Sequence, residues 1–269
     1  MKHALRYCIL AAASFLILAP VLYALLISVE TAADSMAFPP KFIPSQLYLE
    51  SYTKALQTAP VFRFILNSFL VSAAVTLGQL ITCSLAAYAF AFLEFPGRKL
   101  WFYVFLSTMM IPWEATIIPN YFTIRSLDWL DTYQGLAVPF LASAFGTFLL
   151  RQAFQTLPKE IFEAARMDGC GQFRFFLTMV LPLSRPALAT LAVYAFLTTY
   201  NQYMWPLLVT NSDSIRTVQI GLAMLQWDQA IAWNTSMAGV VLVSLPTILL
   251  LVFGQKQLVR GLTAGATKG

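Results

Sequence analysis

The chain has 269 residues, of which 59% are hydrophobic and only 11% charged, and its formal net charge is +5. Soluble domains carry about 25% charged residues, so this composition excludes an ordinary water-soluble enzyme and indicates a membrane protein. Lys and Arg stand singly between apolar runs, without the basic stripe of a nucleic-acid-binding protein. One histidine and three widely spaced cysteines exclude a His-dependent catalytic group and suggest neither a disulfide framework nor a metal cluster.

Six apolar runs are long enough to cross a bilayer, and together they predict one all-α membrane domain, a six-helix transmembrane bundle over residues 1–269. The first run exceeds the apolar core of a signal peptide, which is about 7–15 residues long, so we expect it to stay in the membrane. The runs occupy about 7–29, 62–92, 100–122, 133–154, 182–208 and 234–253.

The basic residues sort cleanly between the two sides that six spans define. Five lie on one side: Lys41, Lys54, Arg63, Arg125 and Arg216. Twelve lie on the side of the termini: Lys2, Arg6, Arg98, Lys99, Arg151, Lys159, Arg166, Arg174, Arg185, Lys256, Arg260 and Lys268. The positive-inside rule therefore predicts that both termini are cytoplasmic.

The segment 158–174 is the longest predicted cytoplasmic connection, and it carries helix signals. Pro158 suits a first helical position, and Glu160 and Glu163 favour the positive start of a helix. Gly169 can adopt the left-handed cap that ends one. Residues spaced by three and four then form a face with little side-chain bulk, open to close docking by another protein: Ile161, Ala164, Ala165 and Asp168.

The same segment fits a longer pattern: Glu-Ala-Ala, three residues, Gly, nine residues, an aliphatic, any residue, Leu-Pro. Its members are Glu163, Ala164, Ala165, Gly169, Met179, Leu181 and Pro182. An ordinary amphipathic loop is the alternative, but seven positions at fixed spacing favour a motif. The chain thus resembles the permease subunits of binding-protein-dependent ABC importers, in particular the carbohydrate-uptake class related to maltose permeases. One departure is Met179, where that family usually has Ile.

That resemblance implies a coupling helix between the fourth and fifth spans, seated in a cleft of a cytoplasmic ATPase subunit. Glu163 would make polar contacts to the ATPase, Ala164 and Ala165 would permit close approach, and Gly169 would turn the chain. It also implies an inner-membrane location and three partners: a second homologous permease, an ATPase dimer and an extracytoplasmic solute-binding protein. The chain lacks a Walker A loop, so ATP and Mg²⁺ are expected on the ATPase and no cofactor on this chain.

The stretch 200–208 is similar to a Trp-Asn-containing stretch of carbohydrate-class permeases, with Tyr200 in place of the usual Trp. Within that class, 130–136, 201–203 and 259–262 most resemble the glycerol-3-phosphate permease subunits. We therefore expect a carbohydrate or a sugar- or glycerol-phosphate-type solute. The alternative function is an ion-coupled secondary transporter, which would need inverted repeats and ionisable groups inside the membrane. Glu114 is the one strong candidate for such a group. An intramembrane enzyme is a weaker alternative, because no nucleophile–base or metal group is visible.

Polar and aromatic residues within the runs are candidates for the translocation path: Asn67, Glu114, Asn201, Gln202 and Trp205. The amides could equally bridge helices, and Glu114 could lie at the outer interface or pair with a cation of the partner permease. Trp205 could belong to the aromatic belts at span ends. Pro112 and Pro119 remove backbone hydrogen bonds that lipid cannot replace, so we expect the third span to be broken.

Overall fold

The computed structural model describes residues 2–227 and 232–263, with side chains over 5–158, 160–225 and 232–255. All regular structure in this described part is helical, which confirms the all-α fold class. The chain divides into two compact units: residues 1–65 with 217–247, and residues 66–216 with 248–269. Some basic side chains used for the topology lie outside the described residues: Lys2, Lys159, Lys256, Arg260 and Lys268. So do the side chains of the tail stretch 259–262.

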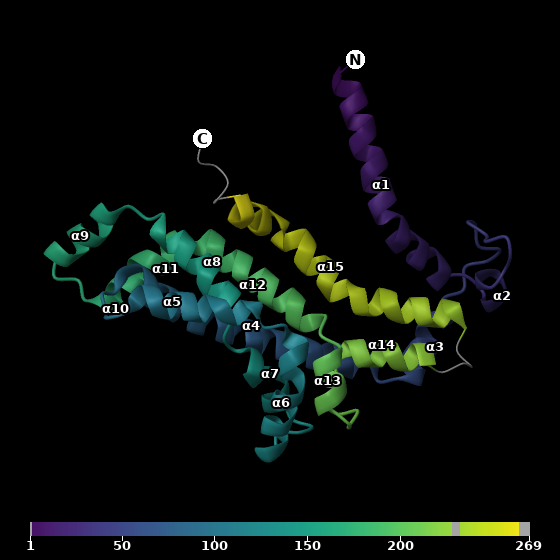
Figure 1. Cartoon of the computed structure of the whole chain (residues 1–269). Helices are drawn as coiled ribbons and strands as arrows, with labels where there is room; N and C mark the ends of the chain where they lie inside the picture. The colour runs from purple at the N-terminus through teal and green to yellow at the C-terminus, as the bar shows by residue number, and fades with distance from the viewer. Residues whose placement is uncertain (1, 228–231, 264–269) are drawn as a thin grey trace. The chain divides into compact units, whose positions relative to one another are not determined.

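Figure 1 labels the helices along the chain. They are α1 (Lys2–Ser28), α2 (Ala32–Ser35), α3 (Glu50–Thr58), α4 (Val61–Phe92), α5 (Arg98–Ser107), the 3₁₀ turn η1 (Thr108–Met110), α6 (Trp113–Ser126), α7 (Tyr133–Ala137), the 3₁₀ turn η2 (Val138–Phe140), α8 (Ala144–Gln155), α9 (Lys159–Met167), α10 (Gln172–Phe175), the π-helical turn η3 (Phe176–Val180), α11 (Leu181–Leu183), α12 (Arg185–Tyr200), α13 (Met204–Val209), α14 (Val218–Trp227) and α15 (Trp233–Thr263).

Three unbroken helices are long and apolar enough to cross a membrane: Leu5–Ser28, Val61–Phe92 and Trp233–Gln255. Three further helix pairs pass the same test together but are bent: Arg98–Met110 with Trp113–Ser126 by 96°, Tyr133–Phe140 with Ala144–Gln155 by 46°, and Gln172–Leu183 with Arg185–Tyr200 by 79°. Counting each bent pair as one crossing gives six. The apolar runs at 100–122, 133–154 and 182–208 are therefore not single straight helices.

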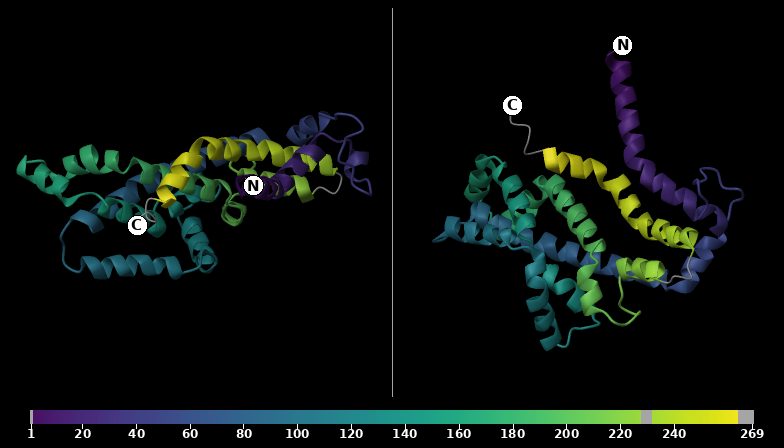
Figure 2. Two further views of the ribbon diagram at one scale, coloured as in Figure 1. Left: turned by 90° about the horizontal axis from the view of Figure 1, so that it is seen from above. Right: turned by 45° about the vertical axis from the view of Figure 1, so that its right-hand side comes forward.

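The third run breaks at Ile111 and Pro112, between η1 and α6. A residue before proline is pushed out of the helical region, and Ile111 is extended with ψ 114°. The expected break is thus confirmed at Pro112, and the bend is visible in Figure 1 and in the right-hand view of Figure 2. Pro119 lies inside α6 without ending it.

The fourth run breaks at residues 141–143, and α4 hydrogen-bonds the exposed carbonyl groups. Lipid offers no such partners, so a broken span must find them within the protein. Three α4 side chains on neighbouring turns donate hydrogen bonds to carbonyl oxygens at the break: Gln79 Nε2 to Phe140 O at 2.9 Å, Thr82 Oγ1 to Leu141 O at 2.6 Å, and Cys83 Sγ to Ser143 O at 3.3 Å. The break is therefore stabilised by hydrogen bonds within this unit.

The fifth run, predicted at 182–208, is divided twice. Pro182 has no N–H, and the preceding turn is π-helical, with Leu181 N donating to Phe176 O. The helix restarts at Arg185 and ends at Tyr200, eight residues before the predicted limit. Pro206 favours the second division, because it has no N–H to donate to the carbonyl group of Gln202 four residues earlier, and it is accommodated in the first turn of the new helix α13.

Candidate functional site

Helix α9 begins at Lys159, with Pro158 as its N-cap and not at the predicted first helical position, and it ends in the predicted left-handed cap. Gly169 has φ 72°, and its N–H donates to Arg166 O at 3.1 Å. Cys170 N–H reaches back to Ala165 O at 2.9 Å, which completes the Schellman pattern at the helix end. A Cβ at Gly169 would meet nothing within 4 Å. The requirement for glycine is therefore one of backbone conformation and not of space.

The two faces of α9 have different surroundings. Ala165 is only 8% exposed, and Ile161 and Phe162 pack with it on the core of the second unit. Glu163, Ala164 and Asp168 are exposed, and Met167 is 84% exposed. The low-bulk stripe expected at Ile161, Ala164, Ala165 and Asp168 is therefore split between an inner and an outer face. Spacing predicts which residues share a side of a helix, but packing decides where that side points.

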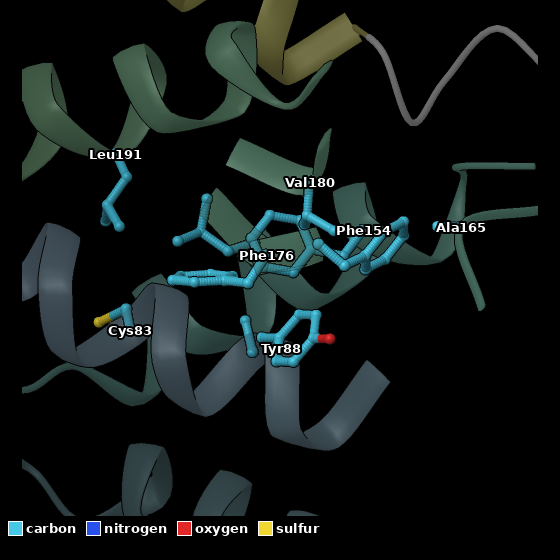
Figure 3. Close-up of a cluster of buried hydrophobic side chains, with 10 residues drawn as sticks. Cys83, Tyr88, Phe154, Ala165, Phe176, Val180 and Leu191 are labelled. Atoms are coloured by element: carbon cyan, nitrogen blue, oxygen red, sulfur yellow. The ribbon is translucent and has the colours of Figure 1, made fainter. Parts of the chain in front are cut away.

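Ala165 belongs to a buried apolar cluster that joins α9 to the transmembrane helices of its unit, shown in Figure 3. The cluster draws on α4, α8, α9, α10, η3 and α12: Cys83, Ala87, Tyr88, Leu150, Phe154, Ala165, Phe175, Phe176, Val180 and Leu191. Leu181, from the predicted motif, packs half-buried against it. Pro182 is also half-buried and lies in the short helix α11 that follows the π turn.

Aromatic contacts continue from α9 into α4. The ring of Phe162 lies 5.6 Å from Phe92 and 5.2 Å from Phe175, and Tyr88 lies 5.3 Å from Phe92. The Tyr88 hydroxyl lies 2.5 Å from Gln172 Oε1 and 3.0 Å from Gln172 O, so α4 is hydrogen-bonded to α10. Ring contacts and a hydrogen bond therefore connect α9 to the end of α4 and to α10, which directly precedes the π turn η3.

A pocket of about 550 Å³ lies between α9 and the neighbouring ends of α4, α5 and α8. Phe92, Phe154 and Phe162 are among its apolar lining, and Glu163 lines it together with Glu94 and Arg98. Glu163 is thus exposed and also lines this pocket, a position open to a polar contact from another chain. Within the described part of the chain, no three His, Cys, Asp or Glu side chains gather in a way that could hold a metal ion.

Trp205 lies inside the second unit and not at its surface. It is 1% exposed, and its indole Nε1 donates to Gly135 O at 3.0 Å, which ties α13 to α7. Its ring makes edge contacts with Trp113 at 5.8 Å and Phe140 at 6.1 Å. In this conformation Trp205 organises the helices beside the broken spans, and its side chain is not open to a solute.

Asn67 makes a three-way bridge in the same unit. It is 2% exposed, and its Nδ2 donates to Ser214 O and Arg216 O, both at 2.9 Å. Its Oδ1 accepts a hydrogen bond from the Tyr133 hydroxyl at 2.7 Å. The amide therefore holds α4, α7 and the 210–217 loop together, which is the helix-bridging role that the sequence left open.

The remaining candidates lie at helix ends. Asn201 follows α12 and is exposed, with its Nδ2 donating to Leu197 O at 2.8 Å. Gln202 is half-buried in the turn between α12 and α13. Glu114 is exposed in the first turn of α6, where a carboxylate is stabilised by the positive end of the helix. A role for these three in the translocation path stays a prediction.

One residue that the sequence analysis did not single out closes the loop beside Trp205. Asp131 has φ 54°, and its carboxylate accepts hydrogen bonds from Asn211 N at 2.6 Å and Ser212 N at 2.8 Å. Its own N–H donates to Val209 O at 2.9 Å. Asp is among the few residues that tolerate this backbone region and can also accept from amides. The sequence feature that could have pointed to Asp131 is its position in the stretch 130–136, which the sequence analysis found similar to glycerol-phosphate permeases.

The Asp131 carboxylate should make the stability of this loop depend on pH. Burial raises the pKa of Asp131, but the amide hydrogen bonds from Ser212 and Asn211 outweigh burial and leave the pKa below its ordinary value. Such a group stabilises the fold above its unfolded pKa, and that stabilisation is lost as pH falls through the folded pKa. In thermal melts of the purified chain, Asp131→Asn should melt below wild type at pH 7, and the gap should narrow as the pH falls below about 4 and close once the pH is below the folded pKa.

Asp128→Asn is the matched control, because Asp128 lies in the same loop and shares the left-handed conformation, with φ 55°. A melting gap for Asp131→Asn that is the same at every pH, or that matches the gap for Asp128→Asn, would contradict the prediction.

Comparison with known proteins adds a family and a fold. Residues 5–264 match the family described as "Binding-protein-dependent transport system inner membrane component". The "sn-glycerol-3-phosphate transport system permease protein UgpE" of Brucella abortus (strain 2308) is 38% identical over 252 residues, covering 90% of this chain and 89% of that protein. The protein of the same name from Pectobacterium atrosepticum is 43% identical over 207 residues, covering 76% and 74%.

A solved structure is also similar in fold. It is titled "Crystal structure of a bacterial ABC transporter involved in the import of the acidic polysaccharide alginate". One of its chains superposes with a TM-score of 0.84 over 95% of both chains, at 22% sequence identity. At that identity the likeness supports the fold alone.

Proposed function

Because the chain belongs to the family of binding-protein-dependent transport system inner membrane components, we propose that it forms one half of the pore of an ABC importer for a glycerol-phosphate-type solute. The permease role follows from the family, which decides against an ion-coupled secondary transporter. We propose the arrangement of partners and the orientation in the membrane from the residues of this chain, and the solute from its relatives.

The observation that carries the proposal is the division of α9 into two faces. Its inner face is fixed by Ala165 and Phe162 in the buried cluster, whereas Glu163 and Ala164 are exposed. A helix that is packed into its own unit on one side and exposed on the other can bind a second protein and pass that protein's movement to the helices it packs against. We propose that a cytoplasmic ATPase subunit binds this outer face, with ATP and Mg²⁺ held on the ATPase dimer.

The remaining assembly follows from the pore and the charges. In this proposal a second, homologous permease completes the pore, and both termini and α9 lie in the cytoplasm. The excess of Lys and Arg beside the termini supports this orientation. When ATP closes the ATPase dimer, α9 moves, and the aromatic contacts of Phe162 with Phe92 and Phe175 carry the motion into α4 and into α10, directly before the π turn. An extracytoplasmic binding protein supplies the solute on the other side.

The proposed solute rests on the relatives, whose names specify sn-glycerol-3-phosphate. A neutral carbohydrate is the second candidate. Uptake into proteoliposomes that contain the complete importer distinguishes the two: labelled sn-glycerol 3-phosphate should accumulate in an ATP-dependent way, and unlabelled sn-glycerol 3-phosphate should compete better than an oligosaccharide.

Glu163→Gln tests the coupling role of α9. Loss of the carboxylate should lower ATP-driven uptake by about tenfold or more, the effect of losing one hydrogen bond to a charged group, while the complex stays assembled. Glu160→Gln is the matched control, because Glu160 is exposed on the same helix but lies in its first turn, outside the motif. Equal uptake by the two variants would show that the outer face at Glu163 does not engage the ATPase.

A further inference from the structure

A second pocket, of about 650 Å³, lies within the first unit, on the side that the charge distribution places outside the cell. It is formed by the start of α2, the segment before α3, α3 itself and the start of α15. Its lining is Thr31, Ala32, Ala33, Gln46, Tyr48, Lys54, Gln57, Thr58, Ala232, Asn234 and Thr235.

The charge of this pocket is positive. Among the described residues that line it, Lys54 is the one with a charged side chain, and the others are neutral. Lys54 Nζ donates to the Tyr48 hydroxyl at 2.7 Å, and that hydroxyl donates to Glu50 Oε2 at 2.7 Å. Lysine is charged at neutral pH at its ordinary pKa, and the hydrogen bond to Tyr48 raises the pKa of Lys54 further.

One wall of the pocket is held by buried polar contacts. Asn234 is 2% exposed, and its Nδ2 donates to Glu30 O at 2.9 Å and to Ser51 Oγ at 3.1 Å. Its Oδ1 accepts from Thr235 N at 2.9 Å. These bonds join the end of α1, α3 and α15, so this wall is formed before any ligand arrives.

Two of the other four cations on the same predicted side form ion pairs. Lys41 forms an ion pair with Asp34 at 2.6 Å, and Arg216 forms one with Asp213 at 2.7 Å. Arg63 is exposed and does not belong to the pocket lining. Arg125 is likewise exposed and outside the lining, so Lys54 is the one of these five cations that lines this pocket, together with the amide and hydroxyl groups of Gln46, Gln57 and Thr235.

We propose that this pocket is an outer binding site for a small phosphate ester, with Lys54 binding the phosphate and the neutral amides and hydroxyls binding the polyol part. The inference rests on the proposed function, because it takes the solute to be a glycerol phosphate. It adds a site on the permease itself, which an anionic solute occupies between the binding protein and the pore. Glu50, on the far side of the Tyr48 hydroxyl, opposes the anion and tunes its affinity.

The test measures binding to the assembled permease–ATPase complex without the binding protein, in phosphatidylcholine nanodiscs. The probes are labelled sn-glycerol 3-phosphate, inorganic phosphate and glycerol. Wild type should bind both phosphate probes and not glycerol. Lys54→Gln should weaken binding of the phosphate probes by about tenfold or more, the effect of losing a charge-assisted contact, while Lys54→Arg retains it and Glu50→Gln strengthens it. Arg63→Gln removes a cation from the same side and should leave binding unchanged.

Equal binding by wild type and Lys54→Gln, or an equal loss in Arg63→Gln, would overturn the proposal. A lipid headgroup carries the same phosphate chemistry, so a parallel set of nanodiscs contains phosphatidylglycerol. Retention of that lipid with no displacement by sn-glycerol 3-phosphate would also overturn it. Uptake of sn-glycerol 3-phosphate by the complete wild-type importer tests the proposed function separately. Normal uptake together with no effect of Lys54→Gln on binding would refute the outer site and leave the proposed function in place.

Discussion

Replacing Gly169 by valine is expected to abolish coupled uptake while leaving ATP hydrolysis and the assembled complex in place. Gly169 has φ 72°, a region that costs an L-residue about 1–2 kcal/mol and costs a β-branched residue more. To relieve that strain, the chain must give up the bonds from Gly169 and Cys170 that close the end of α9. The outer face of α9 would then lose its fixed position. Uptake and ATP hydrolysis, measured on one proteoliposome preparation, check this result.

Gly171→Val is a close control for that experiment. Gly171 lies two residues further along, and a Cβ there would also meet nothing within 4 Å. Its φ of −67° and ψ of 154° suit any residue. Wild-type uptake by Gly171→Val beside lost uptake by Gly169→Val would assign the effect to backbone conformation. Similar uptake by the two variants would refute the argument.

Gly135→Ala is expected to give the largest loss of stability among single methyl additions to the second unit. A Cβ at Gly135 would lie 2.2 Å from the backbone oxygen of Trp129, an atom that cannot rotate away, and 3.2 Å from Ile124 Cγ2. Overpacking of this kind costs about 1–3 kcal/mol. It would also displace the Gly135 carbonyl that accepts the Trp205 hydrogen bond.

Thermal unfolding of the purified chain in detergent, followed by tryptophan fluorescence, measures the effect. Gly135→Ala should unfold several degrees below wild type, as a change of this size does in a domain of 150–250 residues, where 1 kcal/mol shifts Tm by about 2–4 °C. Gly171→Ala should unfold with wild type, because its added methyl group meets open space. An unchanged melting temperature for Gly135→Ala would mean that the Trp129 backbone yields at little cost.

Several features of this protein follow from residue type and spacing alone. The membrane class follows from composition, because free energies of transfer into lipid add along a run of apolar side chains whatever the neighbours are. The end of α9 follows from local chemistry, because Gly169 is the residue that the left-handed cap favours. The break at Pro112 is equally local, since proline excludes the helical region for the residue before it.

Other features depend on residues that are far apart in the chain. The break at 141–143 is tolerated because Gln79, Thr82 and Cys83 accommodate it from α4, and hydropathy cannot register such partners. The Asp131 carboxylate accepts hydrogen bonds from the backbone N–H groups of Asn211 and Ser212, and only the tertiary fold brings these residues next to it.

The two faces of α9 show the same division most clearly. Spacing groups Ile161, Ala164, Ala165 and Asp168 on one side of a helix, but Ala165 is buried in the chain's own cluster while Ala164 is exposed. A helical pattern is a statement about relative angle, and only packing against α4, α8 and the π turn sets the absolute direction. The motif identifies α9 as the candidate coupling helix, and the tertiary structure decides which of its faces stays exposed to bind a second protein.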